Sequence, residues 1–134
     1  MDEAALGRIQ LFDGLSRKQR KLLALRADEV DVKPGRVVCR KGDSGDELYV
    51  IEEGRAKVVR DEQYLDELGP GDFFGEMGIL DDAPRNAHVV ATTPMTLMIL
   101  SGAALKELQR EKPELARQIS STIEQRRHWL EPVL

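Results

Sequence analysis

Between residues 28 and 100, short apolar runs alternate with turn signals, and this spacing limits the possible folds more than any other feature of the sequence. The runs are rich in Val, Ile and Leu, and turns are expected at Pro34-Gly35, Gly42-Asp43, Glu53-Gly54 and Gly69-Pro70-Gly71-Asp72. Inside the runs, as at 46–53, the apolar period is close to two, which indicates β-strands. Roughly seven short strands at this spacing predict an antiparallel sandwich, barrel or jelly roll.

Two junctions in this segment indicate how its strands are connected. Gly54 is typical of a hairpin turn, which would join the run 46–53 to the run that starts at Ala56. Thr93-Pro94 separates two later runs, 87–92 and 95–100, and these are expected to form the last strands.

Helices are expected before the β segment. Residues 4–26 have a helical pattern that breaks at Asp13-Gly14. Ser16 followed by Gln19 matches a capping box, in which each residue binds the backbone of the other. The apolar face of the helix that follows is expected to consist of Leu22, Leu23 and Leu25.

From Ser101 onward the apolar period returns to that of a helix. Ser101 is expected to cap one helix, and Pro113 fits the first turn of a second helix that carries Leu115, Ile119 and Ile123. We therefore predict a single domain over residues 1–134. Its parts are N-terminal helices at 4–26, a β barrel at 28–100 and C-terminal helices at 102–130.

The composition of the chain excludes several classes of protein. Of 134 residues, 41% are hydrophobic and 33% are charged, which excludes a disordered tail, a collagen-like repeat and a membrane protein. No apolar stretch approaches the ~20 residues that span a bilayer, and Asp2 and Glu3 argue against a signal peptide. The single cysteine, Cys39, excludes an internal disulfide, so we expect a cytoplasmic protein in which Cys39 is a small buried hydrophobe. The net charge of −4 is unfavourable for a nucleic-acid binder.

The segment 71–87 differs from an ordinary strand or surface loop. Gly75 would let the backbone turn sharply and approach a ligand closely. Residues 76–80 could form one helical turn, whose unpaired N–H groups favour an anion. Arg85 offers a planar fork that matches two phosphate oxygens, and Glu76 can accept from a sugar hydroxyl. Together these groups predict a site for a ribose phosphate.

Phe74-Gly75-Glu76 and Pro84-Arg85-Asn86-Ala87 resemble the phosphate-binding cassette of the cyclic nucleotide-binding domain family. That family includes the catabolite activator protein and the regulatory subunits of protein kinase A. The supporting glycines and the N-terminal lead-in also match, and the resemblance covers roughly residues 9–130. The matching positions outside the cassette are Leu11-Phe12, Leu15, Gly35, Gly42-Asp43, Gly54 and Gly69-Pro70-Gly71-Asp72.

The resemblance implies a mainly β fold with flanking helices, namely an eight-stranded antiparallel jelly-roll β barrel. It implies that Glu76 accepts the ribose 2′-hydroxyl, that Arg85 clamps the cyclic phosphate, and that the ligand is cAMP or cGMP with no metal. The implied ligand-binding residues are Phe74, Gly75, Glu76, Met77, Arg85, Asn86 and Ala87. Further candidates are Val50, Phe73 and Val89 for the wall around the base, Ile79 and Leu80 for an apolar hinge, and Trp129 for a cap on the purine.

The choice of base depends on one position. In the family a threonine or serine directly after the arginine often helps to select guanine, and this chain has Asn86 there. We therefore expect cAMP in preference to cGMP.

Catalysis is not expected. A metal-dependent cupin enzyme, which shares the jelly roll, needs two or three histidines on barrel strands, and the chain has His88 and His128 alone, 40 residues apart. The cradle also lacks a nucleophile or a pair of acid and base groups. The expected function is a non-catalytic sensor that moves its C-terminal helices when it binds the nucleotide.

Other interpretations stay open. The chain could be a ligand-free interaction module, or the sensor half of a DNA-binding transcriptional regulator, although it leaves no room for a DNA-binding domain of its own. Its protein effector is unknown, and a homodimer is possible. Residues 16–26 carry five cations and no acid, which fits a solvated helix face or a docking patch for an acidic partner or membrane surface.

Overall fold

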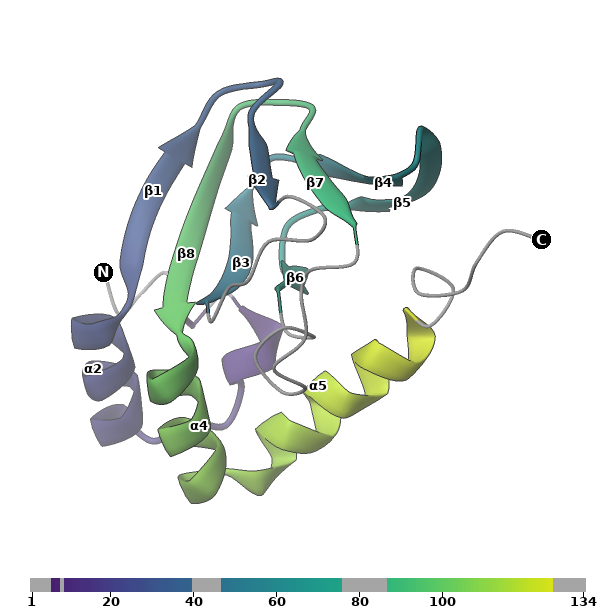
Figure 1. The fold of residues 1–134 in the computed structure, drawn as a ribbon. Coiled ribbons are helices and arrows are strands. Elements are labelled where there is room, and N and C mark those ends of the chain that lie inside the picture. Colours follow the sequence, from purple (N-terminus) through teal and green to yellow (C-terminus); the bar gives the residue numbers. More distant parts are fainter. Residues whose placement is uncertain (1–5, 8, 40–46, 76–86, 127–134) are drawn as a thin grey trace.

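The computed structural model describes residues 6–7, 9–39, 47–75 and 87–126, and all structural statements concern these residues. Eight strands are bracketed by helices (Figure 1). The strands are β1 (Asp28–Val32), β2 (Val37–Cys39), β3 (Glu47–Glu53), β4 (Ala56–Arg60), β5 (Gln63–Leu68), β6 (Phe73–Phe74), β7 (His88–Ala91) and β8 (Met95–Ser101). The helices are the 3-10 turn η1 (Gln10–Phe12), α2 (Arg17–Arg26), α4 (Gly102–Glu111) and α5 (Pro113–Gln125).

The described strands form two antiparallel sheets. One has the order β1-β8-β3-β6 and the other the order β2-β7-β4-β5. The β segment begins at Asp28 and ends at Ser101, one residue beyond the predicted boundary. The predicted class, mainly β with flanking helices, is confirmed.

The predicted hairpin at Gly54 is wrong. Gly54 connects β3 to β4, but these strands belong to different sheets, so Gly54 is a corner between layers. Its φ is +93°, a conformation that favours glycine. A Cβ there would also lie 2.3 Å from the carbonyl oxygen of Pro94, so both the backbone conformation and the lack of space disfavour a side chain. The hairpin lies one strand later, where Asp61 and Glu62 join β4 to β5 with φ of 51° and 67°.

Alternation along the strands builds two apolar clusters. On β3, Leu48 and Val50 face the helices, whereas Ile51 belongs to the cluster between the two sheets. The helix-side cluster contains buried residues of η1, α2, α4 and α5, and the inter-sheet cluster contains residues of all eight strands. Cys39 is a buried member of the inter-sheet cluster, as predicted.

The N-terminal helix α2 begins at the predicted capping box. Ser16 Oγ accepts from the backbone N–H of Gln19 at 3.1 Å, and the backbone N–H of Ser16 donates to Gln19 Oε1 at 2.9 Å. The predicted apolar face is partly wrong, because Leu23 is buried but Leu22 and Leu25 are exposed. The buried side of α2 consists of Leu23 and Ala24, and Leu25 projects from the opposite side of the helix.

The C-terminal helices begin where the sequence predicts. Ser101 Oγ accepts from the backbone N–H of Ala104 at 3.2 Å, and Pro113 is the first residue of α5. Leu115 and Ile119 are buried against the helix-side cluster. Helix α5 is described as far as Gln125, so the predicted continuation to residue 130 lies outside the described residues, as does the predicted start at residue 4. None of the described helices is long and apolar enough to cross a membrane.

Candidate functional site

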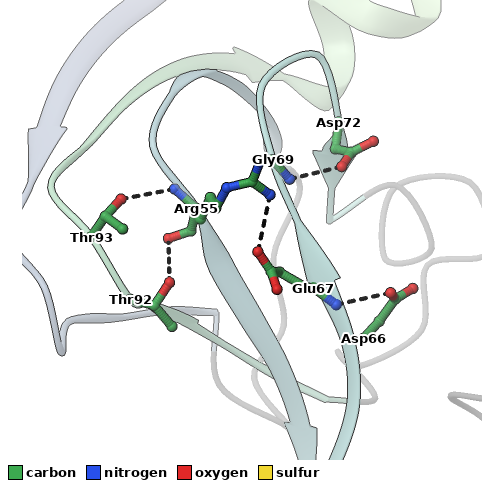
Figure 2. A network of polar contacts seen from close by, with 7 residues as sticks. All are labelled: Arg55, Asp66, Glu67, Gly69, Asp72, Thr92 and Thr93. Atoms are coloured by element: carbon green, nitrogen blue, oxygen red, sulfur yellow. Dashed lines mark hydrogen bonds and ion pairs between the residues drawn. The ribbon is translucent and has the colours of Figure 1, made fainter.

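The turn before β6 is held by hydrogen bonds from two sides. The backbone N–H of Gly69 donates to Asp72 Oδ2 at 2.8 Å (Figure 2). The neighbouring strand β3 adds two bonds, since Ile51 N–H donates to Asp72 O at 2.9 Å and Gly71 N–H donates to Ile51 O at 2.8 Å. The chain therefore enters β6, where the candidate cassette begins, from a fixed position.

Arg55 ties three segments together beside this turn. Its Nη1 donates to Glu67 Oε1 on β5 at 3.0 Å, and its backbone N–H donates to Thr93 Oγ1 at 2.9 Å (Figure 2). Thr92 Oγ1 in turn donates to the carbonyl oxygen of Arg55 at 3.1 Å. These contacts join the start of β4 to β5 and to the β7–β8 connection.

Two predicted ligand-binding residues, Phe74 and Gly75, lie at the end of β6. Phe74 is buried and stacks on Tyr49 of β3, with ring centroids 5.0 Å apart and an interplanar angle of 9°. Gly75 has a φ of +88°, a conformation that favours glycine. Gly75 therefore has the left-handed backbone that the predicted turn needs, and the residues that would complete the turn lie outside the described residues.

A third predicted residue, Ala87, lies where the chain returns to the sheets. It is buried in the inter-sheet cluster directly before β7, with Phe74 in the same cluster. The cassette is therefore anchored at both ends to the space between the sheets. The other cassette predictions, Glu76, Met77, Ile79, Leu80, Arg85 and Asn86, lie outside the described residues, as does Trp129.

Two of the three candidates for the base wall lie side by side, because Val50 of β3 pairs with Phe73 of β6, and the third, Val89, lies apart from them. Val89 belongs to the inter-sheet cluster with Phe74 and Ala87. Val50 and Phe73 belong to the helix-side cluster, on the other face of their sheet. The reason is the two-residue period of a strand, which turns Phe73 and its neighbour Phe74 to opposite faces.

A cavity of about 650 Å³ lies between the sheets' edge and α5. Its walls come from η1, from β5 and the turn before β6, and from the second half of α5. Phe73 lines it together with Asp66, Gln125 and Arg126. Among the wall residues, the sequence predicts Phe73 as a contact of the base and gives no signal for the carboxylate of Asp66.

The described part of the chain has two buried charged side chains, Arg60 and Arg126, which are 7% and 6% exposed. Arg126 follows α5, and its guanidinium carbon lies 5.3 Å from the centroid of the Phe73 ring. Arg60 ends β4 directly after Val59, whose partner on β7 is His88, so Arg60 lies at the end of the ladder nearest Ala87. The signal that could have revealed Arg60 is its spacing, because Ala56, Val58 and Arg60 occupy alternate positions of one strand.

A protein-family model, the cyclic nucleotide-binding domain, matches residues 29–112. The chain therefore belongs to the cyclic nucleotide-binding domain family, which confirms the resemblance found in its motifs. It is a regulatory binding domain rather than an enzyme.

Individual relatives are similar over most of the chain. A cyclic nucleotide-gated potassium channel of Rhizobium etli is 41% identical over 96 residues, which cover 72% of this chain and 27% of the channel. The CRP-like cAMP-activated global transcriptional regulator of Mycobacterium tuberculosis is 30% identical over 131 residues, 94% of this chain and 58% of the regulator. The chain thus spans between about a quarter and three fifths of these relatives.

A solved structure, cAMP-bound PfPKA-R, shares the fold. Its TM-score is 0.86 at 21% identity, and the match covers 96% of this chain and 44% of that one. At this identity the likeness concerns the fold alone.

Proposed function

We propose that this chain, as one domain over residues 1–134, binds a cyclic mononucleotide, cAMP in preference to cGMP, and relays the binding through its C-terminal helix. The observation that carries the proposal is the cassette motif, which occurs here in a chain of this family. The motif begins after β6 at Gly75, which has a left-handed backbone, and ends at the buried Ala87.

The cyclic phosphate would bind between Gly75 and Ala87. The backbone N–H groups of Gly75, Glu76 and Ala87 would donate to its oxygens, and Arg85 would pair with its charge. Phe74, Met77 and Asn86 complete the predicted contacts. The buried cation Arg60, near Ala87, favours an anion at this end of the sheets.

The base would extend toward the cavity beside α5. A volume of about 650 Å³ is adequate for a small ligand. Phe73 lines this cavity, and Trp129 would cap the purine from the helix side, three residues after Arg126. Val89 would contact the ligand from the inter-sheet side. Val50 would support Phe73, its partner across β3 and β6, from the helix-side cluster. The preference for cAMP rests on Asn86 and on the relative whose name describes cAMP activation.

The relay would run from the cassette to α5. In this proposal Ile79 and Leu80 form the hinge that lets α5 move when the cassette closes on the phosphate. The contact between Arg126 and Phe73 joins the end of α5 to the strand that leads into the cassette, so movement at one end has a direct path to the other.

The larger setting is also a proposal. The similarity to the M. tuberculosis regulator covers 94% of this chain, which favours the sensor half of a transcriptional regulator, and the channel relative gives a second setting. In either setting we propose a cytoplasmic location and a protein effector.

Calorimetric titration with cAMP and cGMP tests the binding. We expect saturable binding of both, at least tenfold tighter for cAMP, and much weaker binding of 5′-AMP, whose open phosphate lacks the ring. Tighter binding of cGMP would overturn the base preference alone. Absence of heat and of competition with either cyclic nucleotide would overturn the sensor and support a ligand-free interaction module.

A further inference from the structure

The exposed apolar side chains gather on one stretch of the chain. Among the described residues, four large apolar side chains are exposed, and three of them lie within nine consecutive residues. They are Leu22, Leu25 and Val30, which are 46%, 84% and 37% exposed. Exposed apolar residues that gather on a soluble surface mark contacts with other molecules, so this stretch is a candidate contact surface.

The same stretch carries opposite charges on its two halves. Helix α2 has five cations and no acid, and Lys18 and Lys21 flank Leu25 on its exposed side. Strand β1 follows after one residue and carries three exposed acids along the sheet edge, with Glu29 and Asp31 on one face of the strand and Asp28 on the other face beside Val30. Residues 17–31 are therefore basic in the first half and acidic in the second, with exposed apolar side chains in both halves.

Both halves lie on one side of the molecule. Helix α2 and strand β1 follow one another along the same border of the fold (Figure 1). Strand β1 is an edge of its sheet, so one row of its backbone groups has no partner strand in the described sheet order. At the end of the helix, Arg26 pairs with Glu107 of α4, which holds α2 in place beside this edge.

We propose that residues 17–31 form a self-complementary surface that pairs two copies of this chain about a two-fold axis. An isologous contact presents the same patch from both copies. If α2 of one copy lies on β1 of the other, symmetry repeats the contact, and cations face acids twice. The exposed apolar residues of both copies then meet near the axis.

Other occupants fit the surface less well. An anionic membrane would attract α2 but repel the acids of β1 a few residues away. An acidic partner segment would satisfy α2 and leave β1 uncompensated. Direct pairing of β1 with a second β1 would bring like charges together across the edges. A second copy turned by the two-fold axis matches both halves.

The association is expected to be weak and sensitive to salt. One helix and one strand per copy form a contact at the small end of stable interfaces, so we expect a dissociation constant of about 1–100 µM. Exposed charge pairs are screened by salt, and 500 mM NaCl should weaken the dimer at least threefold compared with 50 mM.

Sedimentation velocity between 1 and 300 µM measures the dimer, and charge exchange tests its geometry. Lys18→Glu/Lys21→Glu and Asp28→Lys/Glu29→Lys should each be monomeric alone, and their equimolar mixture should form heterodimers. A chain with all four changes should dimerise again. Leu25→Gln should weaken the dimer at least tenfold. The control Lys57→Glu/Arg117→Glu, which changes the net charge as Lys18→Glu/Lys21→Glu does but at exposed positions elsewhere, should dimerise like the parent.

Thermal unfolding checks that each variant is folded. Cyclic nucleotide binding is a second check, because none of the predicted ligand-binding residues lies on this surface. A parent chain that is monomeric at 300 µM overturns the proposal. So does a mixture of the two reversed variants that stays monomeric, or a control that dissociates as they do. Co-sedimentation of a monomeric parent with anionic vesicles would assign the surface to a membrane instead.

Discussion

The guanidinium of Arg126 lies over the ring of Phe73, 5.3 Å from its centroid. Arg126 also closes α5, because its backbone N–H donates to the carbonyl oxygens of Thr122 at 3.0 Å and Ile123 at 3.1 Å. One residue thus joins the end of the last described helix to β6, the strand that leads into the candidate cassette.

Replacement of Arg126 by Met keeps much of the apolar stem and removes the cation. We expect a loss of stability of about 0.5–2 kcal/mol, measured by urea unfolding. Arg117→Met, at an exposed position of the same helix, is the control and should change stability by less than about 0.5 kcal/mol. A double-mutant cycle with Phe73→Leu should show coupling between the two positions, and additive effects would mean that the contact contributes nothing.

Arg85→Leu should weaken cAMP binding far more than it weakens folding. Loss of one partner of a buried charge pair typically costs about 2–5 kcal/mol, or roughly 30- to several-thousand-fold in affinity. Glu76→Gln should cost less, because an amide oxygen still accepts from a hydroxyl. Calorimetry measures both variants, with Arg36→Leu in the exposed β1–β2 turn as the control. Parental affinity in Arg85→Leu would refute the cassette assignment.

Trp129 is the single tryptophan, so its emission reports on one position. If it caps the purine, saturating cAMP should change the emission, and Trp129→Ala should weaken binding about ten- to hundredfold, since base stacking contributes about 1–3 kcal/mol. The control is 5′-AMP at the same concentration. Unchanged emission at calorimetric saturation, with parental affinity in the alanine variant, would transfer the cap to Arg126, Arg127, Leu130 or another chain.

Two glycines with similar backbones separate conformational strain from steric clash. Gly54 and Gly35 have φ of +93° and +88°, but a Cβ meets Pro94 and Met95 at Gly54 and nothing within 4 Å at Gly35. Gly35→Ala should cost about 1–2 kcal/mol from the left-handed backbone. Gly54→Ala should cost about 2–5 kcal/mol because the clash adds to the same strain. Equal urea midpoints for the two variants would contradict a packed corner at Gly54.

Glu62→Gly should stabilise the protein. Glu62 has a φ of 67° in the β4–β5 turn, where glycine adopts the conformation without the steric cost borne by other residues. We expect a gain of about 1 kcal/mol in urea unfolding. The same substitution at Glu29, in strand β1, should destabilise by about 0.5–1 kcal/mol. A loss of stability at Glu62 would show that its side chain contributes more than the backbone costs.

Local patterns predict much of this fold. Some features depend on contacts within a few residues and can be predicted from the local sequence. They are the capping box at Ser16 and Gln19, the cap at Ser101 and the strand runs. The assignment of strands to sheets depends on residues far apart, and the pattern around Gly54 does not reveal that β3 and β4 pair with other partners.

The candidate site is predicted less completely. Gly75 and Ala87 could be found because a motif names them, and in the structure Gly75 has a left-handed backbone and Ala87 is buried. The burial of Arg126 could not be found, because an arginine in a sequence is far more often exposed than buried, and strand alternation is the one signal that points to the burial of Arg60. The sequence predicts Leu22 and Leu25 on the apolar face of their helix, but the helix turns both side chains away from the core.

The two sheets are interleaved along the chain, with consequences for how the domain folds. Among the described strands, the β4–β5 turn is the one connection that joins successive strands of the same sheet. The first sheet cannot be completed until both ends of the β segment are present, since β1 pairs with β8, and the second sheet needs β7 before β2 has its partner. Such non-local pairing predicts slow, all-or-none folding, and a chain emerging from the ribosome must release β8 before β1 has its partner. The Asp61–Glu62 turn is therefore the place where an inserted peptide would delay assembly least.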